Sequence, residues 1–274
     1  MTPFTPKELK NEIKKLLPDK SPGPSGITNR MLQTGDTDFQ GLVLIFFNGL
    51  WEFHTQPSDW QLSLVQPIYK GHNKDTTDPA SYRGIYLNNT LAKLFEGLLR
   101  LIARLTTHTE LFNTLTYNQL GTKPDMQTHD AIYSHFAIIQ HNKYTLEKPT
   151  YVAFVDYSTA DPSVHRDGLS SNLLKNDIRG NMWHHLRARF DKIELRVLHP
   201  DISARHTVDI LRGLAEGSRL SPTLFGIFVA DLVHELRAKF PLRLSTLDGT
   251  HPTRTPSVHS LRTSGLEGYS MLLT

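Results

Sequence analysis

The chain has 274 residues, no cysteine, a formal net charge of +3 with its 14 histidines neutral, and a pI near 9.0. This length permits one large domain or two modest ones with a hydrophobic core. The lack of cysteine excludes disulfides and thiolate metal sites, and the mild basic excess permits nucleic-acid binding without demonstrating it. No apolar run approaches the roughly 20 residues that span a bilayer, and the N-terminus lacks a signal pattern. We therefore expect a soluble intracellular protein with no membrane partner.

An amphipathic helix and a loop rich in proline and glycine open the chain. Thr5 and Pro6 predict a helix start, and the apolar residues that follow share one face until Pro18 ends the helix. Residues 20–27 then read Lys-Ser-Pro-Gly-Pro-Ser-Gly-Ile. This composition favours sharp turns and a close approach of the backbone to a ligand, and it is also typical of an ordinary surface turn.

Three longer helices are predicted before residue 145, over residues 39–54, 90–105 and 128–144. The first is expected to be largely core, on the basis of Leu42, Leu44, Ile45, Phe46, Leu50, Trp51 and Phe53. The second is amphipathic, with an inward stripe of Leu91, Leu94, Phe95, Leu98, Leu99 and Ile102. Its opposite face is expected to be solvated and carries Lys93, Arg100 and Arg104.

A β-hairpin is predicted between the first two of these helices. Residues 60–70 and 81–87 alternate well enough for strands and are joined by a polar turn. The first strand ends on Lys70, and the returning strand carries Arg83. The hairpin therefore places two cations where they can meet an anionic ligand.

A buried strand is predicted at residues 151–155, where the run is apolar, β-branched and aromatic and ends abruptly in Asp156. A carboxylate delivered to the end of a strand, with a helix following a turn, is a common way to hold a metal ligand. An N-cap or turn aspartate is the structural alternative, and taken alone Asp156 fits that interpretation better.

The second half of the chain is predicted to contain helices, a second hairpin and a tail. Helices are expected from about residue 165 to 174, over 182–190 and over 224–236, and a hairpin over 193–198 and 207–211. His184 and His185 do not predict a metal site, because adjacent helical positions do not face each other. From residue 246 onward neither helical nor strand periodicity is present, which predicts a disordered tail.

Five segments occur in an order that carries more information than any one of them. They are the Lys-Ser-Pro-Gly-Pro-x-Gly-Ile loop, the Pro-Ile-Tyr-Lys and Tyr-Arg-Gly-Ile-x-Leu hairpin, Gln-Leu-Gly, Val-Asp-Tyr-Ser-x-Ala, and Glu-Gly-Ser-x-Leu-Ser-Pro-x-Leu-Phe. In this order the chain resembles the reverse transcriptase domain of non-LTR (LINE-type) retrotransposons, from about residue 9 to residue 236. The resemblance implies an α+β, right-hand polymerase fold with a ferredoxin-like palm sheet and helices behind it. It divides the chain into fingers and fingers/palm helices (1–145), an incomplete palm (146–245) and a disordered or frameshifted tail (246–274), without a thumb.

The resemblance also implies an active site. Asp156 matches the aspartate that binds both catalytic Mg²⁺ ions, assisted by the backbone carbonyl of Tyr157. In this family a primer 3′-hydroxyl attacks the α-phosphate of a dNTP, and two metal ions stabilise the attacking and leaving oxygens. Lys70 and Arg83 match the fingers residues that hold the triphosphate, for which a guanidinium is well suited.

Two further kinds of contact are implied by the same match. Gly217 and Ser218 match a loop whose small residues let the backbone approach the template and the incoming nucleotide. Gln119 falls in a block that contacts the template, and Lys20 is assigned to template binding as well. The expected partners are therefore an RNA template, a DNA primer and a dNTP.

Three residues depart from the family pattern. Ser25 stands where aspartate is usual, a change that a turn can absorb. Glu216 replaces the usual glutamine before the glycine, which turns a neutral amide into a charged acceptor. Asp161 occupies the steric-gate position, where Phe or Tyr screens out the 2′-hydroxyl of the incoming sugar. A carboxylate there is expected to repel the triphosphate.

The family's aromatic-x-Asp-Asp motif does not occur in this sequence. Asp156 alone provides too few carboxylate ligands to coordinate two Mg²⁺ ions well, so this chain is expected to be inactive. A frameshift between about residues 246 and 264 would explain the loss, since the last residues can be back-translated into a sequence close to Tyr-Val-Asp-Asp. Two alternatives to an active polymerase remain: a catalytically dead nucleic-acid-binding remnant, and the unstable product of a degenerate reading frame with an exposed sheet edge.

Overall fold

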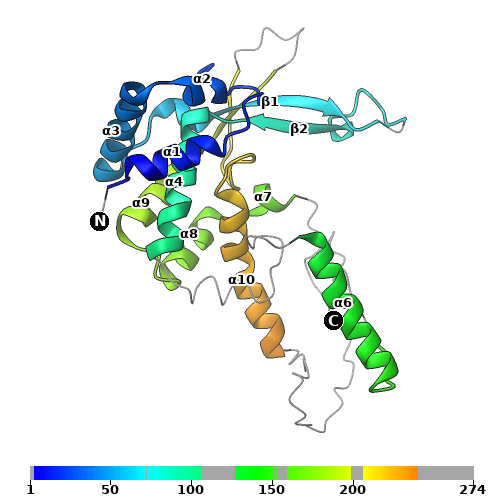
Figure 1. Ribbon diagram of the computed structural model, residues 1–274. Helices are drawn as coiled ribbons and strands as arrows, with labels where there is room; N and C mark the ends of the chain where they lie inside the picture. Colours follow the sequence, from blue (N-terminus) through cyan, green and yellow to red (C-terminus); the bar gives the residue numbers. More distant parts are fainter. Residues whose placement is uncertain are drawn as a thin grey trace. The chain divides into compact units, whose positions relative to one another are not determined.

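The structure, a computed structural model, describes residues 3–71, 73–106, 127–150, 152, 159–198 and 206–239, with only the backbone for 100–106 and 232–239. Contacts divide the chain into two compact units (Figure 1). Unit 1 comprises Met1–Leu115 and Asp161–Phe228, and unit 2 comprises Thr116–Ala160 and Val229–Thr274. Within the described residues, no helix has both the length and the apolar character needed to cross a membrane.

The N-terminal helices of unit 1 begin where the sequence provides caps. Helix α1 spans Pro6–Lys14, and Thr5 and Glu8 cap it reciprocally, which satisfies amide groups that the first turn leaves unpaired. Helices α2 (Asn29–Thr34) and α3 (Thr37–Phe53) are capped in the same way by the side chains of the residues before them. The predicted start of the first helix is confirmed.

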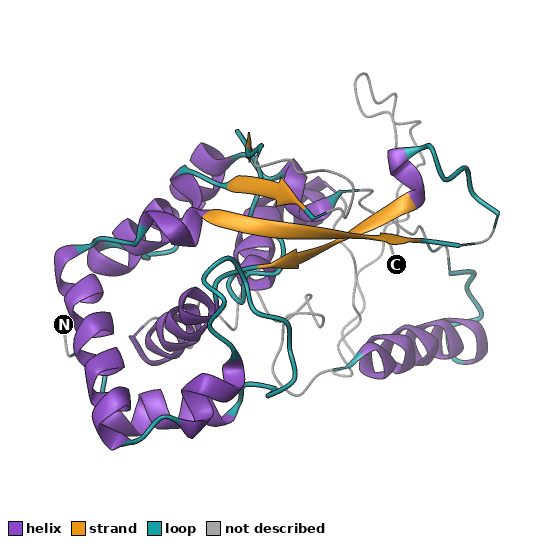
Figure 2. Cartoon of the chain, turned by 90° about the horizontal axis from the view of Figure 1, so that it is seen from above, coloured by secondary structure: helices purple, strands orange, loops and turns teal. Residues whose placement is uncertain are grey.

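Within the described residues, a mixed four-stranded sheet joins segments from both halves of the chain in the order β2-β1-β3-β4 (Figure 2). Strand β1 (Leu62–Tyr69) pairs antiparallel with β2 (Tyr82–Leu87), and β3 (Glu194–Val197) pairs antiparallel with β4 (Val208–Asp209). Both predicted hairpins are thus confirmed. The parallel pairing of β1 with β3 joins them into one sheet, and it runs across the boundary predicted between fingers and palm.

Helices surround an aromatic core centred on α4 (Thr90–Thr106). Phe95 of α4 is 1% exposed, and its ring contacts those of Phe4, Phe47 and Trp60 at centroid distances of 5.3–5.8 Å. The other helical segments that the structure describes in unit 1 are α7 (Ala160–Ser163), which begins on the last residue of unit 2, α8 (Arg166–Lys175), α9 (Gly180–Asp191), the start of α10 (Ser221–Lys239), and the short 3₁₀ turns η1 (Ser58–Gln61) and η2 (Pro79–Ser81). The helices predicted after residue 165 are therefore present.

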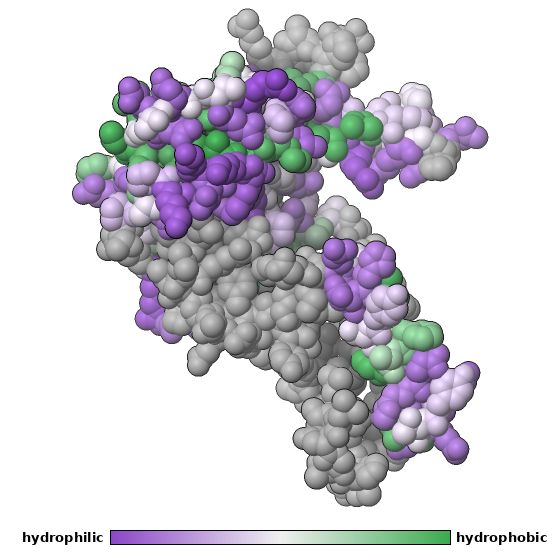
Figure 3. All heavy atoms as spheres, viewed as in Figure 1, coloured by the Kyte–Doolittle hydropathy of each residue, from purple (hydrophilic) through white to green (hydrophobic). Residues whose placement is uncertain are grey.

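Helix α3 is less buried than its composition predicts. Its core contacts come from Val43, Phe47, Leu50 and Trp51, whereas Leu42 and Ile45 are 67% and 71% exposed. The prediction of a largely buried helix was wrong because α3 is apolar around most of its circumference, so composition alone does not identify the buried side. Exposed apolar residues are visible among hydrophilic ones where α1–α3 lie (Figure 3).

Lys93 also departs from expectation. The amphipathic pattern of α4 places it on the solvated face, yet it is half-buried. Burial lowers the pKa of Lys93, and the nearby charge of Glu96 opposes that change. Arg219, in the loop before α10, donates from Nη1 to the Lys93 carbonyl at 3.5 Å, a contact with a distant segment that periodicity within a single helix does not reveal.

Helix α6 (Thr128–Tyr144) lies in unit 2 and has the bounds that the sequence predicts. It carries no buried residue, and Ile132 and Phe136 are exposed. The apolar side chains of α6 are therefore not part of a buried core.

His185 of α9 is fully buried, and its ring stacks on Trp51 at a centroid distance of 5.0 Å. Its Nε2 lies 3.2 Å from the Trp51 carbonyl oxygen, which can only accept, so this nitrogen carries the proton. Burial lowers the pKa of His185; the hydrogen bond to the Trp51 carbonyl opposes this change, and the nearby imidazoles of His54 and His184 add to it. The buried ring is neutral as a result.

Acid is therefore expected to destabilise the chain through His185. Because its folded pKa lies below the ordinary value near 6.5, the unfolded chain binds the proton first, and stability falls as pH drops below about 6.5. Replacing His185→Phe keeps the ring stack and should reduce the loss of stability between pH 7.5 and 5.5, measured by urea unfolding. Equal losses in both proteins would contradict this assignment.

Candidate nucleotide and nucleic-acid site

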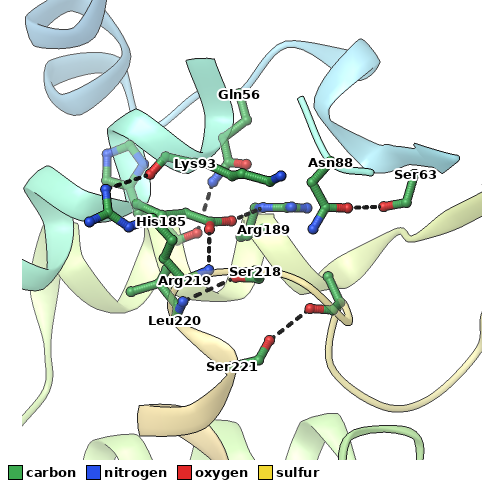
Figure 4. A network of polar contacts seen from close by, with 12 residues as sticks. Gln56, Ser63, Asn88, Lys93, His185, Arg189, Ser218, Arg219, Leu220 and Ser221 are labelled. Carbon is green, nitrogen blue, oxygen red and sulfur yellow. Dashed lines mark hydrogen bonds and ion pairs between the residues drawn. The ribbon is translucent and has the colours of Figure 1, made fainter. Parts of the chain in front are cut away.

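Three of the predicted motifs meet at Asn88, which follows β2 and is 1% exposed. Its side-chain Oδ1 accepts a hydrogen bond from the Ser63 hydroxyl of β1 (Figure 4). Its Nδ2 donates to the Glu216 carbonyl at 3.0 Å. Both ends of this carboxamide are therefore used, one toward the hairpin and the other toward the loop that contains the Glu-Gly-Ser motif.

The proline- and glycine-rich loop contacts the same residue through Gly23. A Cβ on this buried glycine would lie 2.4 Å from both the carbonyl carbon and the oxygen of Asn88. The loop is also tied to the start of α4, where the Thr90 hydroxyl donates to the Ile27 carbonyl at 2.6 Å. Ser25 supports the turn by accepting from the Ile27 amide at 3.3 Å. The glycine thus permits close packing within the protein itself.

Gly217 has a similar role in the second loop. Its φ of +78° lies in the left-handed region, and a Cβ there would come within 3.0 Å of the Tyr86 carbonyl oxygen. Ser218 is 6% exposed, and its hydroxyl accepts from the Leu220 amide at 3.2 Å. The side chain of Ser218 therefore points into the loop, whereas the backbone of Gly217 is exposed.

Asp161 is attached to this loop through backbone contacts. Its carbonyl accepts from the Leu214 amide at 2.9 Å, and Gly213 donates to the Val164 carbonyl at 2.8 Å. Gly213 has a φ of +91°, and a Cβ there would lie 2.7 Å from the Cα of Pro162. The segment that contains Asp161 and the loop that contains Glu216 are consequently held together.

The two acidic departures from the family pattern lie close enough to interact electrostatically, and Glu216 also contacts Tyr86. Burial raises the pKa of Asp161. Burial also raises the pKa of Glu216; a hydrogen bond from the Tyr86 hydroxyl opposes this change, and the charge of Asp161 adds to it. Burial, followed by the charge of Glu216, raises the pKa of Tyr86 to about 12, so the phenol stays protonated and donates. The cluster is two carboxylates with raised pKa values and one hydroxyl donor.

A buried ionic network fixes the far end of the same loop (Figure 4). Glu96 of α4 accepts from the Nε of Arg189 at 2.7 Å and from the backbone amide of Arg219 at 2.8 Å. The Arg219 guanidinium continues to Glu12 of α1, with 3.0 Å between Nη1 and Oε2. A Cβ on Gly97 would lie 2.4 Å from that Nη1, so only glycine leaves room for the guanidinium.

Lys70 and Arg83 lie on a face of the hairpin different from that of Tyr86. Arg83 pairs with Ile68 and Tyr86 with Val65, so alternation puts Arg83 on one side and Tyr86 on the other. Lys70 shares the exposed side with Arg83, and its Nζ donates to the Ala80 carbonyl at 2.7 Å. The two cations are thus together, separate from the acidic cluster. Lys20 is exposed.

The remaining predicted site residues, Asp156, Tyr157 and Gln119, lie outside the described residues, as does the predicted tail. Within the described residues no group of three or more His, Asp or Glu side chains could hold a metal ion. Burial of Asp161 and Glu216 raises the pKa of both carboxyl groups and so disfavours their charged forms. The described residues therefore do not by themselves fit a magnesium centre, although reverse transcriptases generally use Mg²⁺.

Sequence reasoning missed Asn88, Tyr86 and Glu96. For Glu96 a signal was available, because it follows Ala92 by four residues and precedes Leu99 by three, inside the apolar stripe of α4. Asn88 and Tyr86 gave no comparable signal, since their partners come from distant segments.

An α+β chain with a mixed sheet, and with these loops assembled beside it, is consistent with the fingers and palm of a polymerase. The sequence model of the family described as "Reverse transcriptase (RNA-dependent DNA polymerase)" matches residues 71–251. The chain belongs to this family.

The particular relatives are polymerases of non-LTR elements. The chain is similar to the RNA-directed DNA polymerase from mobile element jockey of Drosophila melanogaster, with 27% identity over 98% of this chain and 29% of that protein. It is also similar to the probable RNA-directed DNA polymerases from transposon BS (27% identity, 84% of this chain) and transposon X-element (25% identity, 85% of this chain) of the same organism. The chain spans about a quarter of the length of these curated relatives.

Proposed function

We propose that this chain forms fingers and part of a ferredoxin-like palm of a retrotransposon reverse transcriptase, which binds an RNA template, a DNA primer and a dNTP. The main supporting observation is that three family motifs meet at Asn88. The loop at residues 20–27, the β1–β2 hairpin and the loop at residues 213–220 all contact this one buried side chain or its backbone.

Within this proposal each predicted site residue has a role. Lys70 and Arg83 bind the triphosphate from the exposed face of the hairpin, where a guanidinium can form two parallel hydrogen bonds with phosphate oxygens. Asp156 and the carbonyl of Tyr157 hold Mg²⁺. The exposed backbone of Gly217 lies against the template and nucleotide.

Template contacts complete the proposed assignment. Lys20 and Gln119 contact the template. Phosphate contacts such as that of Lys20 are independent of sequence and weaken as the salt concentration rises.

We further propose that this chain binds nucleic acid but extends a primer poorly or not at all. The supporting observation is the pair Asp161 and Glu216. Asp161 stands at the steric-gate position and Glu216 directly precedes Gly217, so negative charge on these carboxylates opposes the approach of the nucleotide, although Lys70 and Arg83 lie on another face of the hairpin. This second function, binding without polymerisation, is favoured over an active enzyme for that reason.

Primer extension on poly(rA)·oligo(dT) with Mg²⁺ or Mn²⁺ tests both parts. We expect extension near the background set by Asp156→Ala, together with template–primer binding that decreases as salt is raised. Extension well above that background, abolished by Asp156→Ala, would contradict the proposed loss of activity. If the folded chain neither binds the template–primer nor extends it, the polymerase assignment itself is contradicted.

A further inference from the structure

Asn88 is not assigned to any site by the family match, yet it connects the three segments proposed to contact the nucleotide. Its carboxamide makes one bond to β1 through Ser63 and one to the 213–220 loop through the carbonyl of Glu216. Its own carbonyl lies against Gly23, in contact so close that no side chain fits between them. These three neighbours are widely separated in the sequence.

The burial of Asn88 makes these contacts strong determinants of geometry. A carboxamide that is 1% exposed cannot exchange its partners for water, so loss of either bond leaves a buried donor or acceptor unsatisfied. The bond from Nδ2 reaches the carbonyl of Glu216, directly before Gly217, whose own backbone lies against the carbonyl of Tyr86. Movement of the 213–220 loop away from the hairpin therefore requires that the Asn88 bond break.

We propose that Asn88 is a positioning residue for nucleotide binding: it holds the 20–27 loop, the β1–β2 hairpin and the 213–220 loop in one fixed arrangement. This inference rests on the proposed function, because the nucleotide is the ligand whose binding requires that arrangement. The physical benefit is preorganisation, since loops that are already ordered lose less conformational freedom when the ligand binds.

The test compares dTTP binding to the chain on poly(rA)·oligo(dT) with Mg²⁺ for the wild type, Asn88→Ala and Ser63→Ala. Asn88→Ala removes both bonds and should weaken dTTP binding by about tenfold. Ser63→Ala leaves the loop contact in place but removes the partner of Oδ1, and should weaken binding by roughly threefold. Asn88→Asp is nearly isosteric and keeps the acceptor of the Ser63 hydroxyl but lacks the Nδ2 donor to the loop, so it should also weaken dTTP binding.

A control separates positioning from a general loss of stability. Ile178 is buried at 4% exposure between α8 and α9, and Ile178→Val should lower the melting temperature without touching the three segments. If Asn88→Ala binds dTTP as tightly as Ile178→Val does, the positioning role is wrong.

Hydrogen–deuterium exchange tests the arrangement without any nucleotide. Asn88→Ala should increase amide exchange in residues 20–27 and 213–220 together, whereas Ile178→Val should not. An increase confined to one segment, or none, overturns the proposal. If the wild type binds no dTTP, the nucleotide-binding part of the proposed function fails, and amide exchange alone then decides whether Asn88 joins the three segments.

Discussion

Glu96→Ala is expected to destabilise the chain by about 3–5 kcal/mol, because it leaves a buried arginine without its counter-ion. Glu96 and Arg189 are each 2% exposed, and the ion pair between them, 2.7 Å from Nε to Oε1, compensates both charges. The same substitution removes the acceptor of the Arg219 amide. Urea unfolding monitored by circular dichroism measures the loss.

Two comparisons identify the cause of that loss. Glu52→Ala removes the same side chain from an exposed position of α3 and should change stability by less than about 0.5 kcal/mol. The double substitution Glu96→Leu with Arg189→Met removes both charges and should recover much of the loss, since an apolar pair avoids the desolvation of two ions. A double variant that is no more stable than Glu96→Ala would show that the ion pair is not the cause.

Removing the acidic pair is expected to improve nucleotide binding. Glu216→Gln with Asp161→Asn should tighten dTTP binding at pH 7.5 by about tenfold, roughly 1.4 kcal/mol, a modest figure because solvent screens these half-exposed groups. Asp161→Phe alone, which also restores the aromatic ring at this position, should likewise improve dNTP binding. Asp167→Asn removes one unit of charge from an exposed site on α8 and serves as the matched control. A titration in which neither the double variant nor Asp161→Phe binds dTTP more tightly than Asp167→Asn would contradict the prediction.

The same pair sets an expected dependence of stability on pH. Both carboxyl pKa values are raised, so between the ordinary and the raised pKa the folded chain keeps protons that the unfolded chain has released. Stability therefore decreases as pH rises through that window, and the double variant Glu216→Gln with Asp161→Asn should not show this decrease. Melting temperatures of the wild type and the double variant, measured from pH 4 to pH 7.5, test this prediction. Parallel curves for the two proteins would show that Asp161 and Glu216 do not cause the pH dependence.

Local pattern was sufficient for the hairpins and for the start of the first helix. The hairpin at Lys70 and Arg83 follows from alternation and a polar turn, and the start of α1 follows from Thr5 and Pro6. The pairing of β1 with β3 could not be predicted in this way. A period of two indicates which side chains share a face, but it does not identify the neighbouring strand when that strand lies far along the chain.

The candidate site was predictable only in part for a related reason. Motif order located Gly217 and Asp161, but their contacts depend on how distant segments pack. Gly217 needs its missing Cβ because of Tyr86, and Ser218 is turned inward by the Leu220 amide, neither of which a motif encodes. Glu96 was missed because a charged residue in an apolar stripe is explained only by its partner, Arg189, on another helix.

The parallel pairing of β1 and β3 has a consequence for biosynthesis. During translation the hairpin that contains β1 leaves the ribosome long before Glu194–Val197 are made. Until then one edge of β1 has unpaired amide and carbonyl groups, and such an edge can pair with a strand of another nascent chain. Completion of the sheet therefore depends on the order and speed of synthesis as well as on the final contacts.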